Sequence, residues 1–134
     1  MAVDLAKDSI DLGIVVRDAA AALKFYRDTL GFEHVGDMDM GRGTTMHRLQ
    51  CGSSLIKLIA MATAPEASPA PGGVYAGSGY RYWTITVRDI AATVQACKAG
   101  GYAVPLDVRE IRPGTQMAMV EDPDGNWVEF LQQA

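Results

Sequence analysis

The sequence of 134 residues has few cysteines, no excess of positive charge and no long hydrophobic run. Its two cysteines, Cys51 and Cys97, lie far apart and fit neither a CxxC motif nor a zinc-binding spacing. With 16 acidic and 12 basic residues the net charge is −4, which argues against a nucleic-acid partner, because phosphates attract clustered Lys and Arg. The first residues include acidic side chains and no apolar run, so we expect no signal peptide, no membrane anchor and a cytoplasmic protein.

The first half of the sequence indicates a strand, a helix and a hairpin. The β-branched run from Ile10 to Val16 predicts a strand, and Asp18 predicts the N-cap of a helix that runs to about Leu30. Gly31 is expected to end this helix. The expected buried face of this helix consists of Ala19, Leu23, Tyr26 and Leu30. Two strands are expected around the Gly-Ser-Ser turn, Thr44 to Cys51 before it and Leu55 to Ala60 after it.

The second half repeats this pattern. Tyr82 to Val87 predicts a strand, Asp89 predicts a second N-cap, and Gly101 follows the second helix. The expected buried face of the second helix consists of Ile90, Val94 and Cys97. The strands expected around the second turn are Thr115 to Val120 and Trp127 to Leu131. The repeat predicts one domain of two modules, residues 8–61 and 80–134, joined by a linker rich in Ala, Pro, Gly and Ser at residues 62–79.

Three motifs carry a family resemblance: Val16-Arg17-Asp18, Phe25-Tyr26-Arg27-Asp28-Thr29-Leu30-Gly31-Phe32 and Asp122-Pro123-Asp124-Gly125-Asn126. They resemble the vicinal oxygen chelate superfamily of glyoxalases, bleomycin-resistance proteins, extradiol dioxygenases and methylmalonyl-CoA epimerases. The resemblance covers essentially the whole chain. It implies an α+β fold of two tandem βαβββ modules whose curved mixed sheets form a cup, in a homodimer. It does not specify a reaction, because one fold hosts many chemistries.

Metal-using members of that superfamily place four ligands, commonly His, Glu or Gln, His and Glu, on the first and last strand of each module. The resemblance puts Asp11, Lys57, Tyr82 and Glu129 at these positions, and only Glu129 agrees with the family pattern. An ammonium has no lone pair, and a tyrosine ligates only as phenolate, far from its ordinary pKa of about 10. We therefore expect no metal and no other cofactor at these positions.

The resemblance also predicts that Asp11, Lys57, Tyr82 and Glu129 converge. They would either support one another by ion pairs and hydrogen bonds, or move a proton on a bound ligand. Strand alternation and hairpin pairing suggest the ligand contacts Arg48, Thr84, Met117, Met119 and Trp127, which include an apolar, polarizable wall suited to a flat organic ligand. Entrance loops are expected at residues 37–43, 62–79 and 109–114.

Three functions remain open at this point. The first is a binding protein that holds a small organic, possibly aromatic ligand without a metal. The second is a metal-free isomerase, cyclase or lyase that transfers protons through Lys57, Tyr82 or Glu129. The third is a metal-dependent lyase or dioxygenase with a displaced ligand set that recruits His47. Apart from that alternative, His34 and His47 are given no catalytic role, and His47 is expected to face the helices or solvent.

Overall fold

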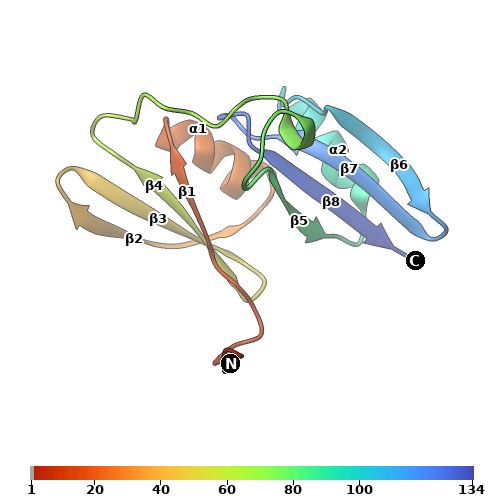
Figure 1. The fold of residues 1–134 in the computed structure, drawn as a ribbon, viewed down its shortest axis with the longest axis horizontal. Coiled ribbons are helices and arrows are strands. Elements are labelled where there is room, and N and C mark those ends of the chain that lie inside the picture. Colours follow the sequence, from red (N-terminus) through yellow and green to blue (C-terminus); the bar gives the residue numbers. More distant parts are fainter. Residues whose placement is uncertain (1) are drawn as a thin grey trace. The chain divides into compact units, whose positions relative to one another are not determined.

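The computed structural model describes residues 2–134 and contains two four-stranded mixed sheets, each with one helical segment packed on it (Figure 1). The chain divides into a first unit that ends at Pro65 and a second unit of Glu66–Ala134, which also takes in Asp28–Leu30. Along each unit the elements follow in the order strand, helix, strand, strand, strand. The α+β class and the two tandem modules predicted from the repeat are thereby confirmed.

The first sheet has the strand order β1-β4-β3-β2, with β1 and β4 parallel and the other pairs antiparallel. Its elements are β1 (Leu12–Val16), α1 (Ala19–Leu23), a π-helical continuation η1 (Lys24–Thr29), β2 (Glu33–Gly41), β3 (Thr44–Cys51) and β4 (Ser54–Ala60). The buried residues of the helical segment and of the sheet face beneath it are Val16, Ala22, Phe25, Tyr26, Leu49, Ile56 and Leu58.

The second sheet repeats this topology with the order β5-β8-β7-β6, and β5 and β8 are parallel. Its elements are β5 (Tyr82–Thr86), α2 (Ile90–Ala99), β6 (Leu106–Arg112), β7 (Thr115–Glu121) and β8 (Trp127–Gln133). The helix α2 packs on β6, β7 and β8, and its buried residues are the predicted Ile90, Val94 and Cys97. The sheet residues of the same core are Ala118, Val120, Val128 and Phe130.

Both helices begin as the sequence predicts. The Asp18 carboxylate accepts a hydrogen bond from the Ala21 N–H at 3.2 Å, and Asp89 accepts one from the Ala92 N–H at 3.0 Å. These are N-cap bonds, which satisfy backbone donors that lack partners in the first turn of a helix. Gly31 has φ of +81°, the left-handed conformation expected of a residue that ends a helix.

The predicted buried face of the first helix is wrong in part. The buried helical residues are Ala22, Phe25 and Tyr26, whereas Leu23 stays half-buried. From Lys24 the helix continues with a wider π-helical turn, which shifts later side chains from their α-helical positions, and Phe25 is buried there although the predicted face omits it.

The predicted entrance loops at residues 37–43 and 109–114 are also wrong for most of their length. The edge strand β2 extends through Gly41, and β6 extends through Arg112. Both strands are mostly exposed and interrupted by bulges, and they alternate apolar and charged residues only over short stretches, 37–40 in β2 and 106–109 in β6, so the sequence signal for a strand is weak. Only short turns join them to β3 and β7.

The linker keeps little regular structure beyond a short 3₁₀ turn, η2 (Gly73–Tyr75). Among the described residues, no helix is long and apolar enough to cross a membrane.

The turn between β7 and β8 is organised by one buried carboxylate, that of Asp122, which is 4% exposed. Its Oδ1 accepts hydrogen bonds from the N–H groups of Asp124 and Asn126, both at 2.9 Å, and its Oδ2 accepts one from Asn126 Nδ2 at 3.0 Å. The Asp-Pro-Asp-Gly-Asn motif therefore has a structural role here, because it fixes the hairpin that sets the register of Glu129.

We predict that Asp122→Ala lowers the free energy of unfolding by about 2–4 kcal/mol, because three donors to a buried charged acceptor lose their partner. Asp122→Asn keeps one acceptor oxygen and should cost clearly less. Urea denaturation of the three proteins measures both differences. A loss below about 0.5 kcal/mol for the alanine variant would contradict the structural role of the motif.

Candidate functional site

The positions expected to form the site fall in both units, Asp11 and Lys57 in the first and Tyr82 and Glu129 in the second. Each pair is described within its own unit, and the convergence of all four stays a prediction. The strand residues among them, Lys57, Tyr82 and Glu129, lie on the sheet face opposite the helix, which we call the helix-free face. Their strand neighbours Ile56, Leu58, Val128 and Phe130 are buried on the other face.

In the first unit, Asp11 lies just before β1 rather than inside it. Its Oδ1 accepts hydrogen bonds from the Lys7 ammonium and the Leu55 N–H, both at 2.8 Å. These two bonds, with the more distant charge of Lys57, hold the pKa of Asp11 below its usual range. Lys57 is paired with Arg48 across β3 and β4, so the predicted hairpin register is confirmed and two cations lie side by side.

In the second unit, Glu129 is held by Thr84. The two residues are partners in the parallel pair β5–β8, and the Thr84 hydroxyl donates a hydrogen bond of 2.7 Å to Glu129 Oε1. Tyr82 is the partner of Trp127 and is 48% exposed. The strand alternation therefore brings Thr84 to Glu129 as the sequence suggests, and the threonine orients one oxygen of the only carboxylate that agrees with the family pattern.

Beside Glu129 lies an apolar cluster of Met117, Met119 and Trp127, packed against Leu106 and Leu131. Met119 pairs directly with Glu129 across β7 and β8. The expected grouping of these three side chains near Glu129 is therefore confirmed. None of the three is more than 9% exposed, so the wall is closed as it stands rather than open to solvent.

Part of that closure comes from residues 66–79 of the linker, which we call the strap. Gly73 lies against the Trp127 ring, so closely that a Cβ on Gly73 would stand 2.3 Å from Trp127 Cδ2. Arg81 holds the strap from the start of the second module: its Nε donates to the Gly73 carbonyl at 2.7 Å and its Nη2 donates to the Ala70 carbonyl.

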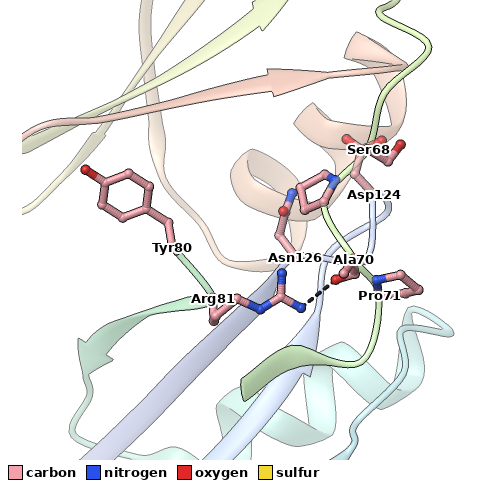
Figure 2. Close-up of a pocket in the computed structure, with 9 residues that line it drawn as sticks. Ser68, Ala70, Pro71, Tyr80, Arg81, Asp124 and Asn126 are labelled. Carbon is pink, nitrogen blue, oxygen red and sulfur yellow. Dashed lines mark hydrogen bonds between the residues drawn. The ribbon is translucent and has the colours of Figure 1, made fainter. Parts of the chain in front are cut away.

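A small pocket of about 180 Å³ opens between the strap and the Asp-Pro-Asp-Gly-Asn turn. Figure 2 shows the Arg81 guanidinium reaching Ala70 and the Tyr80 ring pointing away. Ligand pockets usually measure about 300–1,000 Å³, so this pocket is too small for a drug-sized molecule. Because the Arg81 donors already bind strap carbonyls, we assign the pocket no ligand.

The structure also brings together His34, Asp37 and His47, which sequence reasoning did not group. Asp37 Oδ1 lies 2.6 Å from His34 Nε2 and 2.8 Å from His47 Nδ1. The hydrogen bonds from His34 and then His47 hold the pKa of Asp37 below its usual range. Arg27 in η1 contacts the opposite nitrogen of His34, Nδ1, at 3.4 Å.

The pairing of β2 with β3 is the signal that would have revealed this cluster. It places Asp37 opposite His47 and His34 opposite the buried Leu49. Because the sequence predicts a loop at residues 37–43, it does not indicate this strand pairing. The alternation also places His47 on the helix face, as expected, and so on the opposite face from Lys57. His47 therefore cannot join Lys57 in a displaced metal site.

Comparison with known proteins identifies the family. Residues 9–130 match the model of the Glyoxalase/Bleomycin resistance protein/Dioxygenase superfamily. The chain belongs to this superfamily. Among solved structures, a glyoxalase family protein from Bacillus cereus superposes with a TM-score of 0.82 at 18% identity, covering 99% of this chain and 98% of that one. An antibiotic binding protein from Streptomyces sp. CB03234 superposes with a TM-score of 0.67 at 23% identity, covering 98% and 100%. Both show the fold.

A curated relative of this superfamily member is the lactoylglutathione lyase of Haemophilus influenzae, 40% identical over 57 residues, which are 42% of each chain. The match to a probable chloroplastic lactoylglutathione lyase from Arabidopsis thaliana covers 17% of that protein. The chain thus spans less than half the length of the curated relatives it matches.

The metal used by some members of the superfamily does not fit this chain's side chains. Lys57 brings an ammonium, which offers no lone pair and repels a cation. The Asp11 oxygen is occupied by Lys7 and by the Leu55 N–H. Glu129 remains as one carboxylate in its unit, and a divalent ion needs three or four donors.

We predict that Gly73→Ala destabilises the strap by about 1–3 kcal/mol, because the methyl group overlaps the Trp127 ring and Gly73 has φ of +66°. The matched control is Gly79→Ala, where φ is +96° but no atom lies within 4 Å of the added Cβ. The alanine at position 73 should also expose Trp127 and shift its fluorescence to longer wavelength. Equal effects of the two variants would show that the strap does not rest on Trp127.

Proposed function

We propose that this protein binds a small organic ligand on the helix-free face of its second sheet, without a metal at the four family positions. The observation that carries the proposal is the cluster of Met117, Met119 and Trp127 beside the Glu129–Thr84 pair. Methionine and tryptophan offer a polarizable wall that adapts to a flat ring. A carboxylate held at the edge of such a wall supplies the polar contact that orients a ligand.

The buried state of the wall requires a route by which a ligand reaches it. The strap supplies one, because it holds no sheet hydrogen bonds and is attached through Arg81 to two of its carbonyls. Lifting Gly73 from Trp127 breaks its hydrogen bond with Arg81 and exposes the indole face. The ligand then replaces the strap as the cover of the wall, which keeps the apolar surface out of water in both states.

In the first sheet, the adjacent cations Arg48 and Lys57 suit an anionic substituent. We propose them as an anion contact of the first unit by itself. The Streptomyces neighbour, described as an antibiotic binding protein, supports small-molecule binding as a use of this fold.

The test is equilibrium binding of a flat aromatic anion, anilinonaphthalene sulfonate, to the chelator-treated protein. The expected result is one compound per chain, recovered unchanged, with quenching of tryptophan fluorescence that survives in Trp83→Phe and disappears in Trp127→Phe. Met119→Ala should weaken binding about tenfold through lost apolar contact. Val120→Ala is the matched control, because Val120 lies next to Met119 on β7 but is buried against the helix. Equal effects of both variants on affinity would remove the second sheet's helix-free face from the site.

A second candidate is a metal-free lyase or isomerase. It is favoured by the curated relatives, named lactoylglutathione lyase, and by the orientation of Glu129 for proton transfer to or from a bound substrate. In this version Tyr82, on the neighbouring strand β5 of the same sheet, supplies a further proton-transfer or charge-stabilising group.

The test of this candidate measures the rate at which the protein converts S-lactoylglutathione in the presence of excess EDTA. Glu129→Gln should abolish turnover and Tyr82→Phe should lower it while the fold is kept, and Thr84→Val should lower kcat by freeing the Glu129 carboxylate. Glu110→Gln, on β6, is the matched control and should leave the rate unchanged. Absence of turnover in the wild-type protein, or full rates in both variants, removes the candidate and leaves the binding proposal standing.

A further inference from the structure

A cluster on the first sheet, independent of the proposed ligand site, has the composition of a transition-metal site. It consists of His34 and Asp37 on the edge strand β2 and His47 on β3. One atom from each residue, His34 Nε2, Asp37 Oδ1 and His47 Nδ1, lies within 4.8 Å of the others. Two imidazoles and a carboxylate are donors that first-row divalent ions prefer.

The hydrogen bonds fix where the ring protons are in the metal-free state. An ionised carboxylate only accepts, so both His34 Nε2 and His47 Nδ1 donate to Asp37 Oδ1. Arg27 only donates, so in its 3.4 Å contact with His34 the ring nitrogen Nδ1 is the acceptor. The two protons thus occupy the nitrogens that an ion would need, and they hold both rings pointed at one spot.

We propose that His34, Asp37 and His47 bind one divalent transition-metal ion such as Zn²⁺, with water completing the coordination. Ligand atoms about 2.1 Å from a tetrahedral ion lie roughly 3.4 Å apart. The rings must therefore approach each other by about an ångström or more, while the Asp37 oxygen withdraws from between them. Asp37 has a side-chain exposure of 51% and lies on an edge strand, so nothing buried has to move with it.

The ion takes the positions that protons occupy on His34 Nε2 and His47 Nδ1. A metal-bound imidazole is neutral and carries its one proton on the other nitrogen, here Nδ1 of His34 and Nε2 of His47. At His34 this Nδ1–H would point at the Arg27 guanidinium, which is itself a donor to Nδ1 in the metal-free state. Arg27 therefore opposes metal binding through both its donor and its charge. A residue that accepts at the same place would reverse that effect, since metal-bound histidines usually donate their second N–H to an acceptor.

The composition of the chain makes the site easy to isolate in an experiment. The sequence contains two histidines, and both belong to this cluster. The two cysteines compete poorly, because burial raises the pKa of Cys51 and raises that of Cys97 to about 11, which keeps the thiols protonated. Histidine-dependent metal binding by this chain can therefore be assigned to this cluster.

The experiment titrates the untagged, chelator-treated protein with Zn²⁺ by calorimetry and with Co²⁺ by visible absorption. We expect one ion per chain, and His34→Gln, Asp37→Asn and His47→Gln should each weaken binding by at least about tenfold. Asp39→Asn is the matched control, since Asp39 lies on the same strand and its Oδ1 accepts from the Gly41 N–H outside the cluster. Arg27→Gln should tighten binding severalfold, because the glutamine side-chain oxygen can accept a hydrogen bond from the Nδ1–H of metal-bound His34.

Two results would overturn the proposal. One is a wild-type protein that is folded but binds neither ion at a concentration of about 1 mM. The other is Zn²⁺ binding that persists in the His34→Gln/His47→Gln double variant, which would place the ion elsewhere. Thermal melts of each variant establish that a loss of binding is not a loss of fold. Because the cluster lies in the first unit and on the helix face, its failure leaves the ligand-binding proposal untouched.

Discussion

The two modules depend on one packing arrangement, in which a helical segment covers one face of a four-stranded sheet. In the second module α2 buries Ile90, Val94 and Cys97 over β7 and β8, and Val128 and Phe130 meet them from the sheet. Burial of these side chains on one face determines the strand phase. A shift by one residue would put the core into solvent. Every side chain on the helix-free face is therefore placed by the packing on the other side.

That coupling explains why the helix-free faces can vary in chemistry while the fold is kept. Lys57 lies between Ile56 and Leu58, and Glu129 lies between Val128 and Phe130. A change of charge at position 57 or 129 leaves these cores intact. The superfamily's metal positions can consequently lose their ligands without loss of the fold, and a lysine is tolerated where a ligand would be expected.

Most of the architecture was predictable because it depends on strong local signals. Asp18 and Asp89 mark the helix starts, and the Asp-Pro-Asp-Gly turn sets the register that joins Met119 to Glu129. In the edge strands the apolar alternation is short and broken by bulges, so the sequence predicts loops there, and the π-helical turn at Lys24 has no sequence signature. The closure of the apolar wall by Gly73 depends on a tertiary contact of an irregular segment, which no pattern in the linker indicates.

The histidine cluster shows the same limit, because it became visible only once β2 was paired with β3. Its position also decides what a bound ion could do. Alternation along β3 sends His47 to one face of the sheet and Arg48, beside Lys57, to the other. An ion on His47 would therefore be separated from the cations of the helix-free face by the sheet itself. It would tie β2 to β3 at the exposed edge of the sheet and restrain that hairpin, rather than polarise a ligand held next to Lys57.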